Sequence, residues 1–340
     1  MAPDFVEKPF DFTRDSLTLS GTLTLPRNKK HPPVILLLPG SGPVDRNENV
    51  EGFIQKIVSN NFQTLAHFLA TQGFASYRYD KRSTNKKLRG SGFNALLNDA
   101  KQAITALKGC NEVNAKQLYV LGHSEGGYLG NIIASKLDEI KGFIVLASSV
   151  TPLDEAVIKQ LDHISNISPK NKKTEQFNQL FSNLFRIMRT HDSWADIDEN
   201  MLKTELKQIS KVISILPAKT VKNMIRKQMQ PEWFMESYEY DFKEHAKKIT
   251  CPVLIIAGEK DYQVPASDAK QMADVISESG NEKVSFTSLP NLNHMLRYNE
   301  GEITPKAQLK SLKMNDFDKR VLDIIQTWLK EIAHPVTAGK

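Results

Sequence analysis

Cysteine is scarce in this sequence of 340 residues, where only Cys110 and Cys251 are present. Two cysteines are too few for the disulfide framework of a small secreted domain, and they lack the close spacing of metal-ligand pairs. We therefore expect two free thiols and a fold held together by its hydrophobic core. With 40% hydrophobic and 25% charged residues, the chain is long enough to bury such a core.

Long hydrophobic runs and basic tracts are also absent. No apolar stretch approaches the ~20 residues that cross a bilayer as a helix, so we expect no integral membrane segment. The first ten residues, MAPDFVEKPF, have neither the basic region nor the apolar core of a signal peptide. This predicts a cytoplasmic protein, or a periplasmic or secreted one if a signal peptide has been removed. The net charge of +6 comes from scattered lysines without interleaved aromatics, which argues against a nucleic-acid partner.

Short apolar runs alternate with helical patterns in two parts of the chain. The predicted strands are 32–43, 74–80, 117–123, 141–149, 252–261 and 283–290. The predicted helices are 60–72, 93–108, 126–137, 266–278 and 315–331. Such alternation indicates an α/β fold with a mostly parallel central sheet flanked by helices. Ahead of it, DSLTLSGTLTLP (15–26) predicts a β-hairpin that turns at Ser20–Gly21 and ends at Pro26.

The pattern changes between 151 and 249, where no buried-strand run occurs. Residues 174–189 carry apolar side chains at helical spacing, 202–216 predict a second helix, and 221–242 add methionines and aromatics. We therefore expect a core formed by 1–150 and 250–340 and a helical cap insertion at 151–249. Its apolar faces either pack within the protein or, in part, line an acyl pocket.

One motif stands between a predicted strand and a predicted helix. Gly122-His123-Ser124-Glu125-Gly126 matches the pattern G-x-S-x-G. A turn this sharp strains the serine backbone, and small residues on both sides prevent clashes between strand and helix. The motif predicts that Ser124 is a nucleophile at the carboxyl edge of the sheet. The alternative is a serine in an ordinary glycine-rich turn.

A serine nucleophile needs a general base and an acid that orients it. Of eight histidines, His294 follows the last predicted strand, where it could overhang the sheet edge. It is the candidate base, and the alternative is a loop histidine that caps the final helix. Asp261 ends the preceding strand and is the candidate acid, with Glu259 and Asp241 as rivals.

The oxyanion of a tetrahedral intermediate needs hydrogen-bond donors. The backbone N–H of Glu125 is one candidate, because it begins the helix after the serine. The second is the backbone N–H of Ser41, in the loop Pro39-Gly40-Ser41-Gly42-Pro43. The alternative is a simple strand-to-helix turn. No role is predicted for the Glu125 carboxylate, and we expect His123 to point away into the packing.

Charged residues follow two of the predicted strands. Asp45 and Arg46 lie after the first, and Asp80, Lys81 and Arg82 end the second. Each could contact substrate. The favoured reading is a salt-bridge network that braces the oxyanion loop.

Five segments together resemble a known superfamily. They are LPGSGPVDRN (38–47), FASYRYDKR (74–82), GHSEGG (122–127), YEYDFKEHAKKITCPVLIIAGEKDYQV (238–264) and LPNLNHML (289–296). In this order they resemble the α/β-hydrolase superfamily, in its bacterial carboxylesterase and serine aminopeptidase-like branch. The resemblance implies a Ser124–Asp261–His294 triad with Ser41 and Glu125 as oxyanion donors. One departure is Ser83-Thr84-Asn85-Lys86-Lys87, where such proteins often have a glycine-rich turn.

The residues and the resemblance predict a serine hydrolase that cleaves a small-molecule ester or acyl substrate through an acyl-enzyme, without metal or organic cofactor. An aminopeptidase, thioesterase or lysophospholipase with the same triad remains an alternative. A peptidase would need groups that hold the amino terminus of a peptide, for example Glu232, Glu236 and Glu239. A non-catalytic binding protein is the least supported reading, because the triad is complete. The sequence predicts no particular acyl-chain length or oligomeric state.

Overall fold

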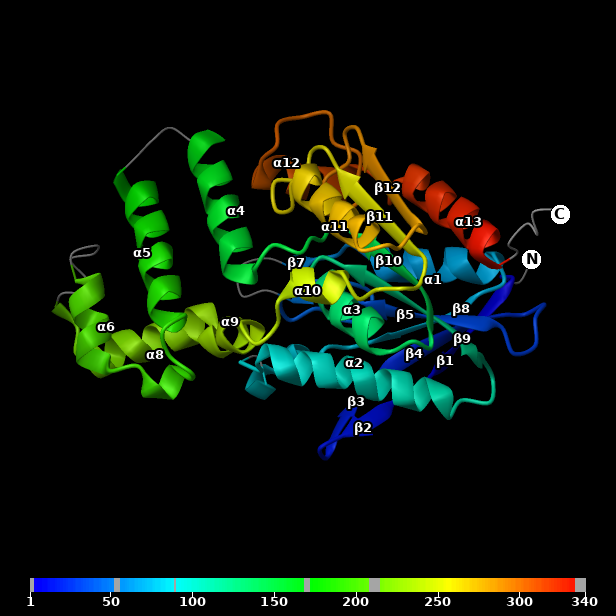
Figure 1. Cartoon of the computed structure of the whole chain (residues 1–340), viewed down its shortest axis with the longest axis horizontal. Coiled ribbons are helices and arrows are strands. Elements are labelled where there is room, and N and C mark those ends of the chain that lie inside the picture. The colour runs from blue at the N-terminus through cyan, green and yellow to red at the C-terminus, as the bar shows by residue number, and fades with distance from the viewer. Residues whose placement is uncertain (1–2, 52–55, 89, 168–171, 208–214, 334–340) are drawn as a thin grey trace. The chain divides into compact units, whose positions relative to one another are not determined.

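The computed structural model describes residues 3–51, 56–88, 90–167, 172–207 and 215–333 (Figure 1). The chain divides into two compact units. One comprises Met1–Arg89, Leu97–Val150 and Phe242–Lys340, and the other comprises Gly90–Leu96 and Thr151–Asp241. The second unit thus ends before 249, the expected end of the insertion. That this unit acts as a cap stays a prediction.

An eight-stranded sheet forms the centre of the first unit, in the order β1-β4-β8-β5-β9-β10-β11-β12. Its strands are β1 (Phe5–Pro9), β4 (Gly21–Pro26), β8 (Ala75–Tyr79), β5 (Pro33–Leu38), β9 (Asn114–His123), β10 (Ile140–Leu146), β11 (Val253–Gly258) and β12 (Val284–Leu289). From β8 to β12 all neighbours are parallel, and β1 and β4 add an antiparallel edge. The predicted, mostly parallel sheet is confirmed.

Helices cover both faces of this sheet (Figure 1). Those of the first unit are α1 (Asn61–Thr71), α3 (Glu125–Lys136), α10 (Phe242–Ala246), α11 (Ala266–Glu278), α12 (Pro305–Met314) and α13 (Lys319–Ala333), and α2 (Phe93–Lys108) begins in the second unit. On one face, α1 and α13 share a buried cluster with Ile35 and Leu37 of β5. On the other face, Gly130 of α3 lies against Phe143 of β10. Alternate residues of a strand point to opposite faces of the sheet. Because both faces are covered here, all six residues of β5 are apolar and buried.

Local contacts explain why the first unit resumes at Phe242. The Asn131 side chain on α3 donates a hydrogen bond to the Phe242 carbonyl at 2.8 Å. The rings of Tyr128 and Phe242 meet edge to face, with centroids 4.7 Å apart. These contacts attach α10 to α3 and place it within the first unit.

The predicted hairpin at 15–26 is wrong in its turn. The strands β2 (Phe12–Arg14) and β3 (Leu17–Leu19) pair across Asp15 and Ser16, whereas β4 pairs with β1 and β8. Asp15 and Ser16 both have positive φ, at 50° and 65°, as a two-residue hairpin turn requires. Gly21 instead begins β4, where a Cβ atom would lie 2.4 Å from the Tyr77 hydroxyl.

The closing segment contains a helix that sequence reasoning missed. We predicted one helix near 315–331, but α13 begins at Lys319 and α12 precedes it as a separate helix. The Thr304 side chain caps α12 by accepting a hydrogen bond from the Ala307 N–H at 3.0 Å, and Pro305 opens the helix. A capping threonine followed by proline is a helix-start signal that the sequence displays.

The second unit is helical, as its sequence predicts. The helices that the structure describes in this unit are α4 (Leu153–Ile167), α5 (Lys172–Met188), α6 (Glu199–Leu206), α8 (Ala218–Met229) and α9 (Pro231–Ser237). The apolar face of α5 packs within this unit, where the rings of Phe185 and Phe234 lie 4.8 Å apart. The predicted helix at 202–216 runs partly through 208–214, which lie outside the described residues. The predicted segment 221–242 breaks at Gln230, which has a φ of 51° ahead of Pro231.

Two shorter features complete the described structure. The two-residue strands β6 (Val50–Glu51) and β7 (Lys56–Ile57) pair with each other, and the 3-10 turns η1 (Arg82–Thr84), η2 (Lys86–Leu88) and η3 (Trp194–Asp196) connect longer elements. Within the described ranges, no helix is long and apolar enough to cross a bilayer.

Candidate active site

Ser124 lies on a strained turn between β9 and α3. Its φ of 51° and ψ of −118° are rare for a residue with a side chain. Its backbone N–H donates a hydrogen bond to the Leu146 carbonyl of β10 at 2.9 Å, which fixes the turn to the sheet edge. Strain of this kind persists only where the surrounding structure holds it, and it concentrates at functional sites.

Two glycines make this turn possible. A Cβ atom on Gly122 would lie 2.3 Å from the Gly126 carbonyl oxygen, and one on Gly126 would lie 1.8 Å from the Leu38 carbonyl oxygen. Strand and helix therefore approach too closely for any side chain at these positions. This close approach is the physical reason that the sequence pattern has glycine on both sides of the serine.

His294 and Asp261 meet in the loops that follow β12 and β11. The His294 Nδ1 and the Asp261 Oδ2 are 2.8 Å apart, and both side chains are buried. The other carboxylate oxygen accepts the backbone N–H groups of Gln263 at 2.7 Å and Val264 at 2.9 Å. A carboxylate that accepts three hydrogen bonds places the imidazole proton on Nδ1 and leaves Nε2 to receive a proton.

The rival acids lie elsewhere. Glu259 is exposed and accepts a hydrogen bond from the Ser288 hydroxyl at 3.3 Å. Asp241 belongs to the other compact unit.

A cavity of about 320 Å³ brings the candidate residues together. Ser41, Ser124 and His294 all line it. Among the described residues, Ser124 and His294 share the cavity without a direct hydrogen bond. Catalytic hydrogen bonds are often long before substrate binds and shorten in the reacting complex.

The loop with the second oxyanion candidate lies against the serine turn. A Cβ atom on Gly40 would lie 3.5 Å from the Ser124 Cβ, so Gly40 is next to the serine. Ser41 lines the same cavity, and Glu125, the residue after Ser124, opens α3. This arrangement brings both candidate donors close to Ser124.

In the described part of the chain, the charged residues after the strands form salt bridges, but the pairs made by Arg46 and Arg82 are not hydrogen-bonded to the loop 39–43. Arg46 pairs with Asp80 through two hydrogen bonds of 3.0 and 2.6 Å. Arg82 pairs in the same way with Asp99 of α2. Asp45 instead stabilises its own loop by accepting backbone N–H groups of Asn47 and Asn49.

Lys81 gives the Glu125 carboxylate a role that the sequence did not suggest. The two side chains form a buried ion pair and are 4% and 3% exposed. The Lys81 ammonium also donates a hydrogen bond to the Gly40 carbonyl at 2.9 Å. The first residue of α3 is therefore connected through Lys81 to the loop that contains Gly40 and Ser41.

Sequence reasoning missed a second buried ion pair, between Glu48 and His123. The Glu48 Oε1 lies 2.8 Å from the His123 Nδ1 and also accepts the Gly40 N–H at 3.0 Å. Its Oε2 accepts the Asn61 side chain at 3.2 Å. The other nitrogen of His123 lies 2.9 Å from the His294 carbonyl oxygen. His123 is buried as expected, but it also lines the cavity of Ser124, and its ring joins the two loops of the site.

The hydrogen bonds determine the charge of His123. Both of its partners are acceptors, so both ring nitrogens donate and the imidazole is positively charged. Burial alone would lower the pKa of His123, but the Glu48 carboxylate raises it overall. Burial likewise opposes ionisation of Glu48, and the facing imidazolium lowers its pKa overall. Such a pair has no sequence signature, because its members lie 75 positions apart.

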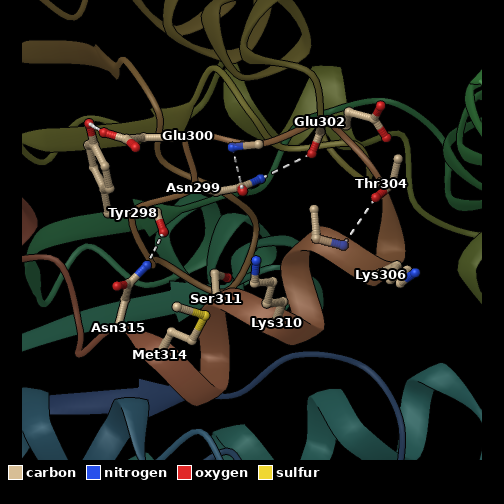
Figure 2. A pocket seen from close by; sticks show the side chains of 12 residues that line it. Tyr298, Asn299, Glu300, Glu302, Thr304, Lys306, Lys310, Ser311, Met314 and Asn315 are labelled. Carbon is tan, nitrogen blue, oxygen red and sulfur yellow. Dashed lines mark hydrogen bonds between the residues drawn. The ribbon is translucent and has the colours of Figure 1, made fainter.

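Helix α12 separates the active-site cavity from a second hollow. Pro305, Gln308 and Leu309 line the cavity of Ser124. Residues on other positions of α12, such as Lys306 and Lys310, line a hollow of about 720 Å³ (Figure 2). Its remaining wall is the loop 298–302, which is tied to itself and to the helix end by the hydrogen bonds drawn there.

The carboxylates that a peptidase would need already have partners in the second unit. Glu236 accepts the backbone N–H of Asn94 at 2.7 Å, and Glu239 accepts the Asn94 side chain at 3.2 Å. Glu232 pairs with Arg226 at 2.7 Å. Burial raises the pKa of Glu236. In the part of the chain that the structure describes, no group of three or more potential metal ligands comes together.

Comparison with known proteins identifies the family of this chain. The profile of the family described as "Serine aminopeptidase, S33" matches residues 50–302, which is more than half of the chain. The esterase EstD of Thermotoga maritima is 28% identical over 333 residues, covering 96% of this chain and 69% of that protein.

Solved structures share the fold at low sequence identity. Est1E from Butyrivibrio proteoclasticus has a TM-score of 0.55 at 14% identity, over 96% of this chain and 98% of its own. The acylaminoacyl peptidase of Pyrococcus horikoshii has a TM-score of 0.56 at 14% identity, over 99% of this chain and 43% of its own.

The chain belongs to the serine aminopeptidase S33 family. The predicted α/β-hydrolase fold and the predicted enzyme class, a serine hydrolase, are thereby confirmed, and the match to an esterase agrees with the branch that the sequence resembles.

Proposed function

We propose that this protein hydrolyses small-molecule carboxylic esters through an acyl-enzyme on Ser124, with His294 as general base and Asp261 as its orienting acid. The observation that supports it most strongly is that His294, held by a buried hydrogen bond to Asp261, lines the same cavity as Ser124 on its strained turn.

The first step is attack on the ester carbonyl. The Ser124 Oγ forms a bond to the carbonyl carbon while its proton passes to the His294 Nε2. The tetrahedral intermediate collapses, His294 gives the proton to the leaving alcohol, and the acyl group remains on Ser124. Water then repeats the sequence with the same base and releases the acid. Asp261 stabilises the imidazolium that forms in each half of the reaction.

The negative charge that develops on the carbonyl oxygen needs fixed donors. We assign these to the backbone N–H groups of Ser41 and Glu125, whose positions next to Ser124 support the assignment. The N-terminal end of α3 adds the positive end of its helix dipole. Donors that are fixed before the reaction act without reorganising, so each typically contributes about 10²- to 10³-fold to kcat.

The size of the cavity favours a small acyl group. A volume of about 320 Å³ lies at the lower end of small-molecule sites. Peptide hydrolysis is the second candidate, because the matched family is described as a serine aminopeptidase. The structural bonds of Glu232, Glu236 and Glu239 favour the ester, because an amino terminus would have to compete for carboxylates that already have partners.

A substrate panel tests this choice. The purified protein is assayed with p-nitrophenyl esters of increasing acyl length and with aminoacyl p-nitroanilides, alongside Ser124→Ala. We expect hydrolysis of short esters, with kcat/KM falling once the acyl chain exceeds the cavity, and little activity on the anilides. Higher kcat/KM for the anilides would replace the esterase proposal by the peptidase, and equal activity of Ser124→Ala would refute both.

A further inference from the structure

The two backbone hydrogen-bonding groups of Gly40 are each held by a buried charge. The N–H of Gly40 donates to the Glu48 carboxylate at 3.0 Å, and Glu48 is itself paired with His123. The carbonyl of Gly40 accepts from the Lys81 ammonium at 2.9 Å, and Lys81 is paired with Glu125. Each hydrogen-bonding group of this one glycine therefore contacts a different buried ion pair.

The bond from Lys81 has a geometric consequence for Ser41. The carbonyl of Gly40 and the N–H of Ser41 belong to the same planar, trans peptide unit, so they point in opposite directions. A donor that fixes the carbonyl direction also fixes the N–H direction. The Ser41 N–H therefore points away from Lys81, on a loop whose residues Gly40 and Ser41 line the cavity of Ser124.

A flexible glycine-rich loop would otherwise leave this peptide free to rotate. Gly42 has a φ of 89°, a Cβ atom at this position would meet nothing within 4 Å, and the Gly42 carbonyl accepts a hydrogen bond from the Ser83 hydroxyl at 2.9 Å. The hydrogen bond from Lys81 to the Gly40 carbonyl restrains the rotation of the Gly40–Ser41 peptide.

We propose that Lys81 and Glu125 are positioning residues that orient the Ser41 N–H toward the oxyanion. The inference rests on the proposed function, because it assumes that Ser41 is an oxyanion donor. It also explains why an acidic side chain follows the nucleophile: Glu125 holds Lys81 at the start of α3. The backbone N–H of Glu125 and its side chain then serve the same oxyanion, the first as donor and the second through Lys81.

The test removes both charges of the Lys81–Glu125 pair together. The variant is Lys81→Met/Glu125→Gln, because loss of only one partner would destabilise the fold. The matched control is Arg82→Met/Asp99→Asn, which removes the adjacent, mostly buried pair that does not touch Gly40. Arg14, which also pairs with Asp99, keeps its ion pair with Asp15 in this control. Wild type and Ser124→Ala are measured in parallel, with p-nitrophenyl butyrate as substrate.

We expect kcat of Lys81→Met/Glu125→Gln to fall about 10- to 100-fold, with KM within about threefold of wild type, because a misdirected donor weakens transition-state binding alone. The control should keep kcat within about threefold. A butyl trifluoromethyl ketone, whose carbonyl oxygen becomes an oxyanion when Ser124 adds to it, should lose affinity by the same factor as kcat/KM.

The outcomes separate the inference from the function on which it rests. If Ser124→Ala is inactive but Lys81→Met/Glu125→Gln keeps wild-type kcat and inhibitor affinity, the positioning role is wrong and the proposed function stands. If the control loses as much kcat as the test variant, the effect is general destabilisation and the inference fails. If Ser124→Ala retains activity, the proposed function fails and the inference falls with it.

Discussion

The Glu48–His123 pair predicts a strong energetic coupling between two residues that join the loops of the site. The perturbations are Glu48→Gln, His123→Gln and the double variant. Each single change leaves one buried charge without its partner, at positions that are 3% and 4% exposed. Breaking one side of a buried pair typically costs about 3–5 kcal/mol of unfolding free energy.

The size of the coupling follows from the geometry. At the observed 2.8 Å, two unit charges attract by about 6 kcal/mol with an effective dielectric constant of ~20. Most of this attraction offsets the cost of removing both charges from water, so removal of both together costs far less than the sum of the singles. We expect the double variant to be no less stable than either single variant, which gives a coupling energy of at least about 3–5 kcal/mol.

The coupling should depend on pH. The pKa of Glu48 is lowered from its ordinary 4.5, so its contribution is present above pH 4.5 and lost as pH falls through the lowered pKa. The pKa of His123 is raised from its ordinary 6.5, so its contribution is present below pH 6.5 and lost as pH rises through the raised pKa. The coupling is therefore largest between about pH 4.5 and 6.5.

Urea unfolding of wild type and the three variants at pH 6 and pH 9 measures this coupling energy. Unfolding is monitored by both fluorescence and circular dichroism, so that non-coincident transitions are detected. Additive single variants at pH 6, within about 0.5 kcal/mol, would refute the reasoning. A coupling energy that does not fall at pH 9 would refute the assigned charge of His123.

Three further predictions follow from single positions. Gly126→Ala should fail to fold, because its Cβ would lie 1.8 Å from the Leu38 carbonyl oxygen, whereas Gly40→Ala should fold. Circular dichroism of both variants checks this, and a folded Gly126→Ala beside an unfolded Gly40→Ala would contradict it. Asp261→Asn should keep the melting temperature within a few degrees but lower kcat by about 10⁴-fold, since it favours the wrong imidazole tautomer; a loss below tenfold contradicts this. At pH 8 an aromatic disulfide reagent should modify Cys251 far more slowly than Cys110, because burial raises the pKa of Cys251 to about 11. Equal rates of modification would contradict the raised pKa of Cys251.

The sequence predicted the parts of the fold that depend on local pattern. The buried strand β5 and the exact limits of α2 and α11 follow from apolar spacing and chain breaks. The hairpin turn failed because the same alternation fits a turn at Asp15–Ser16 or at Ser20–Gly21. Only the pairing partners of β4 distinguish the two.

The candidate site residues, too, could be predicted only where they follow a local sequence pattern. Ser124, Asp261 and His294 could be selected because each follows a recognisable strand at the carboxyl edge of the sheet. Glu48 could not, because an acid in a loop becomes significant only through burial against a histidine far along the chain. Helix α12 was missed although Thr304-Pro305 signalled its start, and it forms part of the cavity wall.

The central claim is that Ser124 is the nucleophile and His294 activates it. The most direct measurement is the rate and site of covalent labelling by a fluorophosphonate, read by intact mass and peptide mapping in wild type, Ser124→Ala and His294→Ala. The account predicts one adduct per wild-type chain, on Ser124, with no adduct in Ser124→Ala and labelling slowed by about 10³-fold or more in His294→Ala. An adduct on another residue, or labelling of His294→Ala at the wild-type rate, would contradict it.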